Sequence, residues 1–63
     1  MMNYEEIKER KALLDRMIRI YGFEHKAVIH FAKLVKNPVF KTGLLETIVK
    51  THEKFPANNE EEF

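Results

Sequence analysis

Two short breaks interrupt an apolar pattern of helical period in this 63-residue sequence, and they limit the folds open to it. Gly22 separates the first apolar segment from the second, and Asn37-Pro38 separates the second from the third. Glycine commonly ends a helix because it reaches left-handed backbone angles at little cost. Proline biases the residue before it away from helical angles. The breaks therefore predict three helices joined by short turns.

The first helix should span about residues 4–21. Asn3 is a preferred N-cap residue, and Glu6 stands three positions later, where a capping box places an acid. The apolar residues of this segment cover roughly 200° of the helix circumference. They are Tyr4, Ile7, Leu13, Leu14, Met17, Ile18, Ile20 and Tyr21. Arg10 and Lys11 interrupt the arc, and their long stems can lie along apolar surface.

The second helix should span about residues 25–36, in the stretch HKAVIHFAKLVK. Its apolar face carries Val28, Phe31, Ala32 and Val35. Lys26, His30 and Lys33 recur at i, i+4 and i+7 on the opposite face. A strand is the competing interpretation for AVIHF, because Val, Ile and Phe favour strands. The flanking charges do not alternate with a period of two, which favours the helix.

The third helix should span about residues 38–54, with Asn37 as its N-cap and Pro38 as its first residue. Val39 and Phe40 would then turn directly into the core. An alternative is that residues 38–41 form a separate turn and that Thr42 caps a later helix. The face expected to be buried carries Phe40, Leu44, Ile48, Thr51 and Phe55.

These elements predict an all-α fold, a small domain of three helices in the order long, short, long. We expect residues 1–55 to form a single helical domain. Residues 56–63 are polar and acidic, and we expect a disordered tail there.

The wide apolar arcs predict self-association. An outer helix needs only about 100° of apolar arc, whereas the first helix covers roughly 200° and the third roughly 180°. So short a chain is marginally stable alone, and without cysteine it forms no disulfide. We therefore expect a homodimer; the alternative is that the helices wrap tightly around Phe31 and Phe40 and bury everything internally. The predicted interface residues, at the outer margins of the arcs, are Leu13, Met17, Ile20, Leu45 and Val49.

The charges are unevenly distributed and indicate a second type of partner. Residues 8–41 hold nine Lys and Arg against three acids, and residues 42–63 hold five glutamates against two lysines. A basic helical nucleic-acid binder with mainly phosphate contacts is therefore the alternative function. Its predicted contacts are Arg16, Arg19, Lys26, Lys33 and Lys36. The tight Asn37-Pro38 turn and the apolar start of the next helix disfavour sequence-specific reading of DNA.

The chain carries no recognisable catalytic or metal-binding motif. Serine and cysteine are absent, and His25 and His30 are five residues apart, which places them on different helical faces. We therefore predict no enzymatic activity, no metal and no cofactor. No apolar run is long enough to span a membrane, so we expect no membrane association and a cytoplasmic location. The preferred function is a small regulatory or adaptor protein that contacts an unidentified protein partner through helix faces.

One stretch, LLDRMIRIYGFEHKAVIHF, resembles the Spo0E-like aspartyl-phosphate phosphatases of sporulating bacteria. Those proteins are helical hairpins, and Gly22, Val28, Ile29 and Phe31 match the spacing of their glycine and the apolar residues after it. The resemblance covers about half the chain and implies a phosphatase as a remote alternative. The family's Ser-Gln-Glu-Leu-Asp signature would fall on residues 32–36, which carry none of its side chains. The resemblance therefore extends to shape and not to activity.

Overall fold

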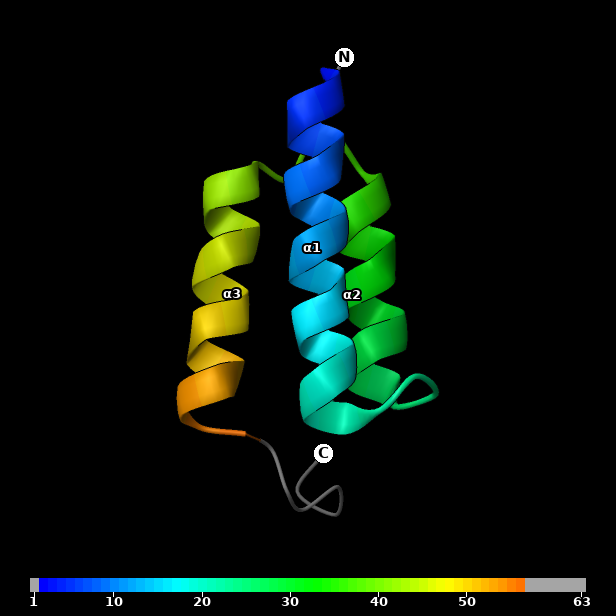
Figure 1. The fold of residues 1–63 in the computed structure, drawn as a ribbon, viewed down its shortest axis with the longest axis vertical. Helices are drawn as coiled ribbons and strands as arrows, with labels where there is room; N and C mark the ends of the chain where they lie inside the picture. Colours follow the sequence, from blue (N-terminus) through cyan, green and yellow to red (C-terminus); the bar gives the residue numbers. More distant parts are fainter. Residues whose placement is uncertain (1, 57–63) are drawn as a thin grey trace.

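The computed structural model describes residues 2–56, which form α1 (Tyr4–Tyr21), α2 (Lys26–Lys36) and α3 (Thr42–Lys54). α1 packs against both other helices, whereas α2 and α3 touch each other only slightly (Figure 1). The predicted all-α fold of three helices is confirmed. The tail predicted to be disordered falls mainly on residues 57–63, which lie outside the described residues.

α1 begins and ends where the sequence predicts. The backbone N–H of Glu6 donates a 2.8 Å hydrogen bond to Oδ1 of Asn3, which satisfies one free donor of the first turn. At the other end, the N–H of Gly22 donates to the carbonyl of Ile18 at 2.7 Å. Gly22 has a φ of 102°, a backbone angle that residues other than glycine rarely adopt.

α3 begins at Thr42, so the prediction of a helix starting at Pro38 is wrong. Asn37 ends α2 instead of capping α3, and its Oδ1 accepts a 2.9 Å hydrogen bond from the backbone N–H of Val39. Such a local side-chain bond competes with helix formation and favours a turn. The alternative of a separate turn is correct, except that Lys41 holds the N-cap position and Thr42 is the first helical residue.

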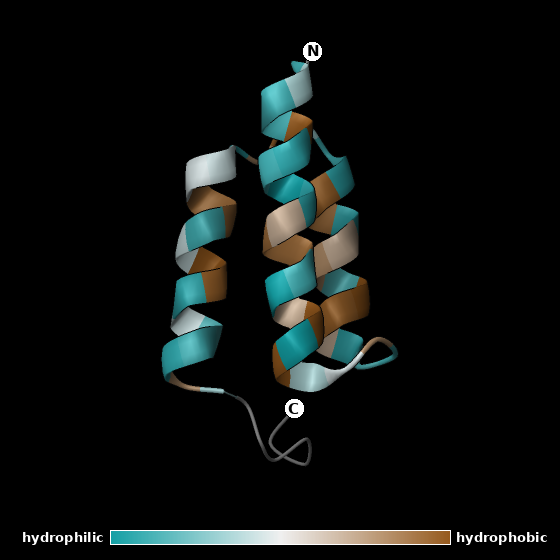
Figure 2. Ribbon diagram, viewed as in Figure 1, coloured by the Kyte–Doolittle hydropathy of each residue, from teal (hydrophilic) through white to brown (hydrophobic). Residues whose placement is uncertain are grey.

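The core lies between α1 and the two helices that flank it, and apolar residues alternate with hydrophilic ones along each helix (Figure 2). Its buried hydrophobic side chains are Leu13, Met17, Val28, Phe31, Val35, Leu45 and Val49. The predicted face of α2 is confirmed at Val28, Phe31 and Val35.

The predicted buried face of α3 is wrong by about one helical position. Leu45 and Val49 are fully buried, while Leu44 is 50 % exposed and Phe55 is 70 % exposed. An arc of roughly 180° has two margins, and packing against α1 alone buries only one of them. Val39 is also exposed rather than turned into the core.

The same geometry corrects the predicted interface residues. Leu13, Met17, Leu45 and Val49 are buried within a single chain, and Ile20 packs against them. Side chains already enclosed by their own chain present no surface to a second copy. The wheel pattern identified these residues as apolar; four of them form part of the core, and Ile20 is partly buried beside it.

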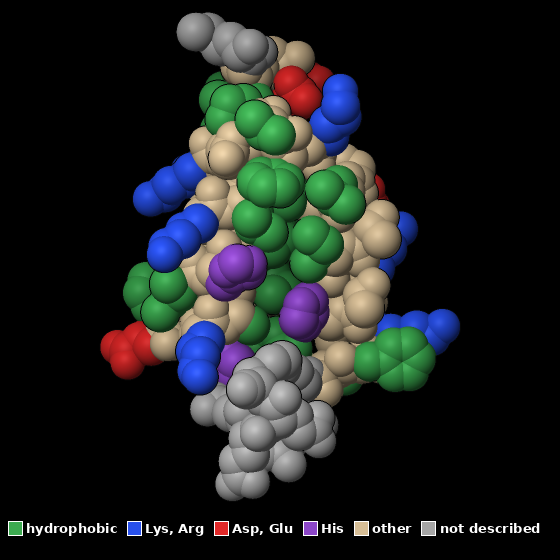
Figure 3. Space-filling view, turned by 180° about the vertical axis from the view of Figure 1, so that it is seen from behind, with side chains coloured by type: hydrophobic (Ala, Val, Ile, Leu, Met, Phe, Trp, Pro, Cys, Tyr) green, Lys and Arg blue, Asp and Glu red, His purple; other side chains and the backbone are tan. Residues whose placement is uncertain are grey.

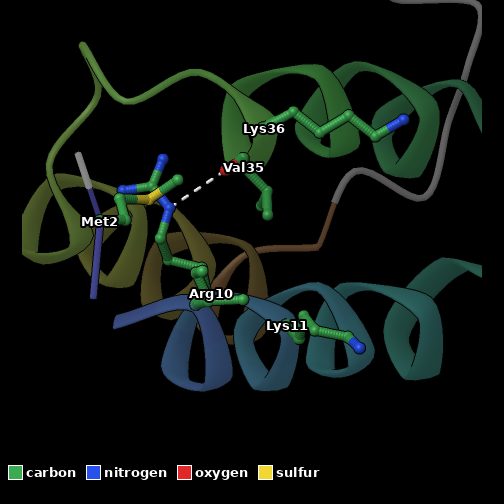
Figure 4. A pocket seen from close by; sticks show the side chains of 6 residues that line it. Met2, Arg10, Lys11, Val35 and Lys36 are labelled. Atoms are coloured by element: carbon green, nitrogen blue, oxygen red, sulfur yellow. Dashed lines mark hydrogen bonds between the residues drawn. The ribbon is translucent and has the colours of Figure 1, made fainter. Parts of the chain in front are cut away.

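Arg10 is the one charged residue among residues 2–56 that is buried, with 2 % of its surface exposed. Its guanidinium points from α1 toward the end of α2 (Figure 4). It donates to four backbone carbonyls at 2.5–3.2 Å, and no carboxylate of the described part pairs with it. Those carbonyls belong to Leu34, Val35, Asn37 and Phe40.

This contact explains how a charge is accommodated in so small a core. The last carbonyls of a helix lack intrahelical partners, and the helix dipole places partial negative charge there. The planar fork of an arginine can serve several such acceptors at once. Arg10 thereby joins α1 to the end of α2 and to the connection that leads into α3.

Replacing Arg10 should strongly destabilise the fold. We expect Arg10→Met to lower the free energy of unfolding by roughly 3 kcal/mol, because it leaves buried carbonyls without donors. Arg10→Lys keeps the charge but not the fork, so its loss should be intermediate. Urea unfolding measures both, with Arg19→Met on the exposed side of α1 as the control. An Arg10→Met variant within about 0.5 kcal/mol of the parent would contradict this assignment.

The two glycines should respond to alanine in opposite directions. A Cβ added at Gly22 would meet no atom within 4 Å, but the positive φ would strain the backbone of any other residue there. Gly22→Ala should therefore lower the free energy of unfolding by about 1 kcal/mol or more. Gly43 lies in the first turn of α3 with open space around it, so Gly43→Ala should stabilise by about 0.4–1 kcal/mol. Thermal and urea unfolding test the pair, and equal effects of the two changes would refute the difference.

Candidate interaction surface

The far side of the molecule from α1 is open because α2 and α3 do not close over it. A continuous line of hydrophobic side chains runs there between the two helices, with histidines beside it (Figure 3). We name this surface the α2–α3 strip. Its residues are Ala27 and Leu34 of α2, Phe40 of the connection, and Leu44 and Ile48 of α3.

The flanks that face α1 show which sides of α2 and α3 line the strip. Lys36 of α2 borders a hollow of about 290 Å³ together with Ile7 and Lys11 of α1. Glu53 of α3 pairs with Arg16, on another side of α1. The opposite flanks of α2 and α3 therefore turn toward each other.

The two rims of the strip differ in charge. On α2, exposed Lys26, His30 and Lys33 share the face opposite the core at i, i+4 and i+7, and His30 is the member nearest Ala27 and Leu34. On α3, the rim carries Thr47 and Thr51, whose hydroxyls donate to carbonyls one turn earlier in the same helix. One rim is basic and the other is uncharged.

An aromatic and histidine cluster lies where the C-terminal end of α1 meets α3. The hydroxyl of Tyr21 lies 2.6 Å from Nδ1 of His52, and the Tyr21 ring stacks on His25 with centroids 4.5 Å apart. The ring nitrogen of His25 also accepts from the backbone N–H of Ala27 and so caps α2. These contacts tie α3 and the α1–α2 loop to the end of α1.

Two hollows lie beside α1 in the described part of the chain. The hollow beside Arg10 is lined mainly by apolar atoms, and four N–H groups of this arginine already bind carbonyls. A second hollow, of about 240 Å³ between α1 and α3, contains Glu9, Arg16, Thr42 and Glu46. Oγ1 of Thr42 is buried there without a hydrogen-bond partner, although part of the residue is exposed.

Within residues 2–56, no three His, Asp or Glu side chains are grouped so that they could hold a metal ion. No helix in this part of the chain combines the length and apolar character needed to cross a membrane.

The residues predicted to contact nucleic acid are not brought together on one face. Arg16 is held by Glu53 of α3 through two hydrogen bonds of 2.9 and 2.7 Å. Lys26, Lys33 and Lys36 are exposed on α2, which packs on another side of α1. Arg19 is exposed on α1. The group therefore divides into a lysine set on α2 and two arginines elsewhere.

The ion pair between Arg16 of α1 and Glu53 of α3 also shifts the pKa of both residues. Hydrogen bonds from Arg16 lower the pKa of the Glu53 carboxyl, and hydrogen bonds to Glu53 raise the pKa of the Arg16 guanidinium. The pair is on the surface, where solvent screens it, so its contribution to stability is small.

In comparisons with known proteins, no protein-family model, no curated protein and no solved structure matches this chain. Residues 32–36, onto which the Spo0E-like signature would fall, form the last turn of α2. Its Val35 is buried, and the carbonyls of Leu34 and Val35 bind Arg10. That turn joins α2 to α1 and carries none of the signature's side chains.

The strip was only partly foreseeable from sequence. The helical wheel left Ala27 and Leu34 out of the apolar face of the second helix, and both side chains are only partly buried. It assigned Leu44 and Ile48 to the core, although Leu44 is half exposed and Ile48 is only partly buried. The signal that pointed to extra apolar surface was the width of the arcs.

The shifted carboxyl predicts a dependence of stability on pH. The folded-state pKa of Glu53 lies below its unfolded value, so the pair stabilises the fold above the ordinary carboxyl pKa of about 4.3. That contribution should disappear as the pH falls through the lowered pKa. The stability difference between the parent and Glu53→Gln should therefore be positive at neutral pH and vanish in acid. Glu24→Gln, in the α1–α2 loop, is the control, and a difference independent of pH would contradict the assignment.

Proposed function

We propose that this chain is a non-enzymatic adaptor or regulatory protein that contacts other proteins through helix faces. The observation that supports this is the α2–α3 strip, an apolar surface on the open side of the bundle. Exposed apolar surface of this continuity is typical of interaction sites. The buried or paired polar groups described above, such as Arg10 and Tyr21, are engaged in holding the helices together.

We propose that the chain forms a homodimer through this strip when no other protein covers it. Two-fold pairing is the commonest symmetry of small assemblies, and it places the same patch of each copy at the interface. In the antiparallel arrangement that we propose, with the two-fold axis running across the helices, the two basic rims, each with Lys26 and Lys33, lie opposite each other. The dimer should therefore strengthen as salt screens the like charges.

Sedimentation equilibrium tests this proposal. We expect the average mass to rise from 7.5 kDa toward twice that value with increasing protein concentration, and to rise further at higher salt. Leu44→Ser should shift the chain toward monomer, whereas Ile29→Ser should not. The two side chains are 50 % and 51 % exposed, and Ile29 lies on the other flank of α2. A monomer at every concentration and salt level would refute the dimer.

Nucleic-acid binding through the lysines of α2 is the second candidate. It is favoured by the exposure of Lys26, Lys33 and Lys36. Phosphate contacts of this kind weaken steeply with salt, so the two candidates differ in the sign of their salt dependence.

A further inference from the structure

The arrangement of the helices leaves room for one more helix. α1 fills the space between α2 and α3 on one side, and nothing among residues 2–56 fills the corresponding position on the other side. The apolar flanks of α2 and α3 line that empty position (Figure 3). A helix laid along the strip would complete a four-helix arrangement, the usual way in which helices with apolar stripes bury them.

The charge around the strip indicates which kind of partner helix is complementary to it. From residue 25 to residue 45 the chain contains four lysines, two histidines and no acidic residue. The acids of α3, Glu46 and Glu53, lie on the flank toward α1, where Glu53 is paired with Arg16. Among residues 2–56, no ion pair engages the lysines of α2, so within this part of the chain the strip is bordered by positive charge. A partner with negative charge beside its apolar face is complementary to it.

We propose that the α2–α3 strip binds an acidic amphipathic helix of a partner protein. The apolar face of that helix contacts Leu34, Leu44 and Ile48, and its carboxylates lie along the rim of Lys26 and Lys33. This inference rests on the proposed function and adds the chemistry of the partner. A nucleic acid would satisfy the lysines but would leave the apolar strip exposed, whereas an amphipathic helix satisfies both.

A designed helical peptide of about 18 residues serves as the probe. It carries leucines at i, i+3, i+4 and i+7 spacing and glutamates beside them, and matched peptides replace every glutamate by glutamine or by lysine. Binding to the full chain is measured by fluorescence anisotropy at about 20 mM and about 150 mM salt. We expect the acidic peptide to bind best and to weaken as salt rises, which is opposite to the expectation for the dimer.

Substitutions in the chain locate the site. Leu44→Ser should weaken binding of the acidic peptide roughly 10-fold, while the equally exposed control Ile29→Ser should not. The double change Lys26→Gln with Lys33→Gln should weaken it about 3- to 10-fold at low salt, and Lys8→Gln with Lys11→Gln on α1 is the matched control. Circular dichroism confirms that each variant is folded.

The outcomes separate this inference from the proposed function. If the glutamine or lysine peptide binds as well as the acidic one and Leu44→Ser weakens it, the strip is a helix site but the acidic partner is wrong. If no peptide binds and Leu44→Ser leaves the sedimentation mass unchanged, both proposals fail. If the peptide binds without reducing the mass of a dimer and Leu44→Ser leaves peptide binding unchanged, the peptide lies elsewhere and the strip belongs to the second copy.

Two further outcomes would overturn the inference in favour of other occupants. A duplex DNA that binds at low salt, displaces the peptide and is insensitive to Leu44→Ser would assign the rim to phosphate binding. The chain's own residues Glu60, Glu61 and Glu62 are the last alternative. If the acidic peptide binds only after these three are changed to glutamine, the chain itself supplies the acidic group.

Discussion

The contact between Arg10 and the end of α2 is the interaction on which the rest of this structure depends. A guanidinium buried to 2 % exposure is costly unless its donors are satisfied, and here four backbone carbonyls accept from it. The same carbonyls would otherwise be buried acceptors without donors. The guanidinium and the carbonyls therefore satisfy each other's hydrogen bonds. Because the acceptors lie both in the last turn of α2 and in the connection to α3, one side chain of α1 stabilises the end of α2 and the turn that follows it.

The interaction surface follows from that anchor. Leu34 and Phe40 each contribute a carbonyl to Arg10, and their side chains line the α2–α3 strip. Arg10 holds this end of the strip on α1, and the Tyr21–His52 contact holds α3 at the other end. With both ends fixed to α1, α2 and α3 pack on it separately and scarcely touch. The open side is thus a result of how the helices are attached, and its apolar residues are held in place by the packing of α2 and α3 on α1.

Local chemistry made much of the fold predictable. The Asn3 cap and the Gly22 stop define α1, and the spacing of Val28, Phe31 and Val35 identifies the buried face of α2. What failed depended on tertiary contacts. The Asn-Pro pair satisfies the rules for a helix start, but Asn37 bonds locally to Val39 and gives its carbonyl to Arg10. A pattern of side-chain spacing contains no information about backbone carbonyls, so the turn at residues 38–41 was only an alternative and the role of Arg10 was not predicted.

The wrong choice of interface residues from the sequence has a related cause. A wide apolar arc indicates more apolar surface than one neighbour can bury, but it does not say which margin stays exposed. In α3 the margin with Leu45 and Val49 packs on α1, and the margin with Leu44 and Ile48 faces the open side. The expectation of extra apolar surface came from the arcs, and its location came only from the three-helix packing. Charge then distinguishes the open side from the core, because Lys26 and Lys33 border the strip while the acids of α3 face α1. The apolar line and the basic rim together favour an occupant that offers both apolar side chains and carboxylates along one axis, which is the pattern of an acidic amphipathic helix.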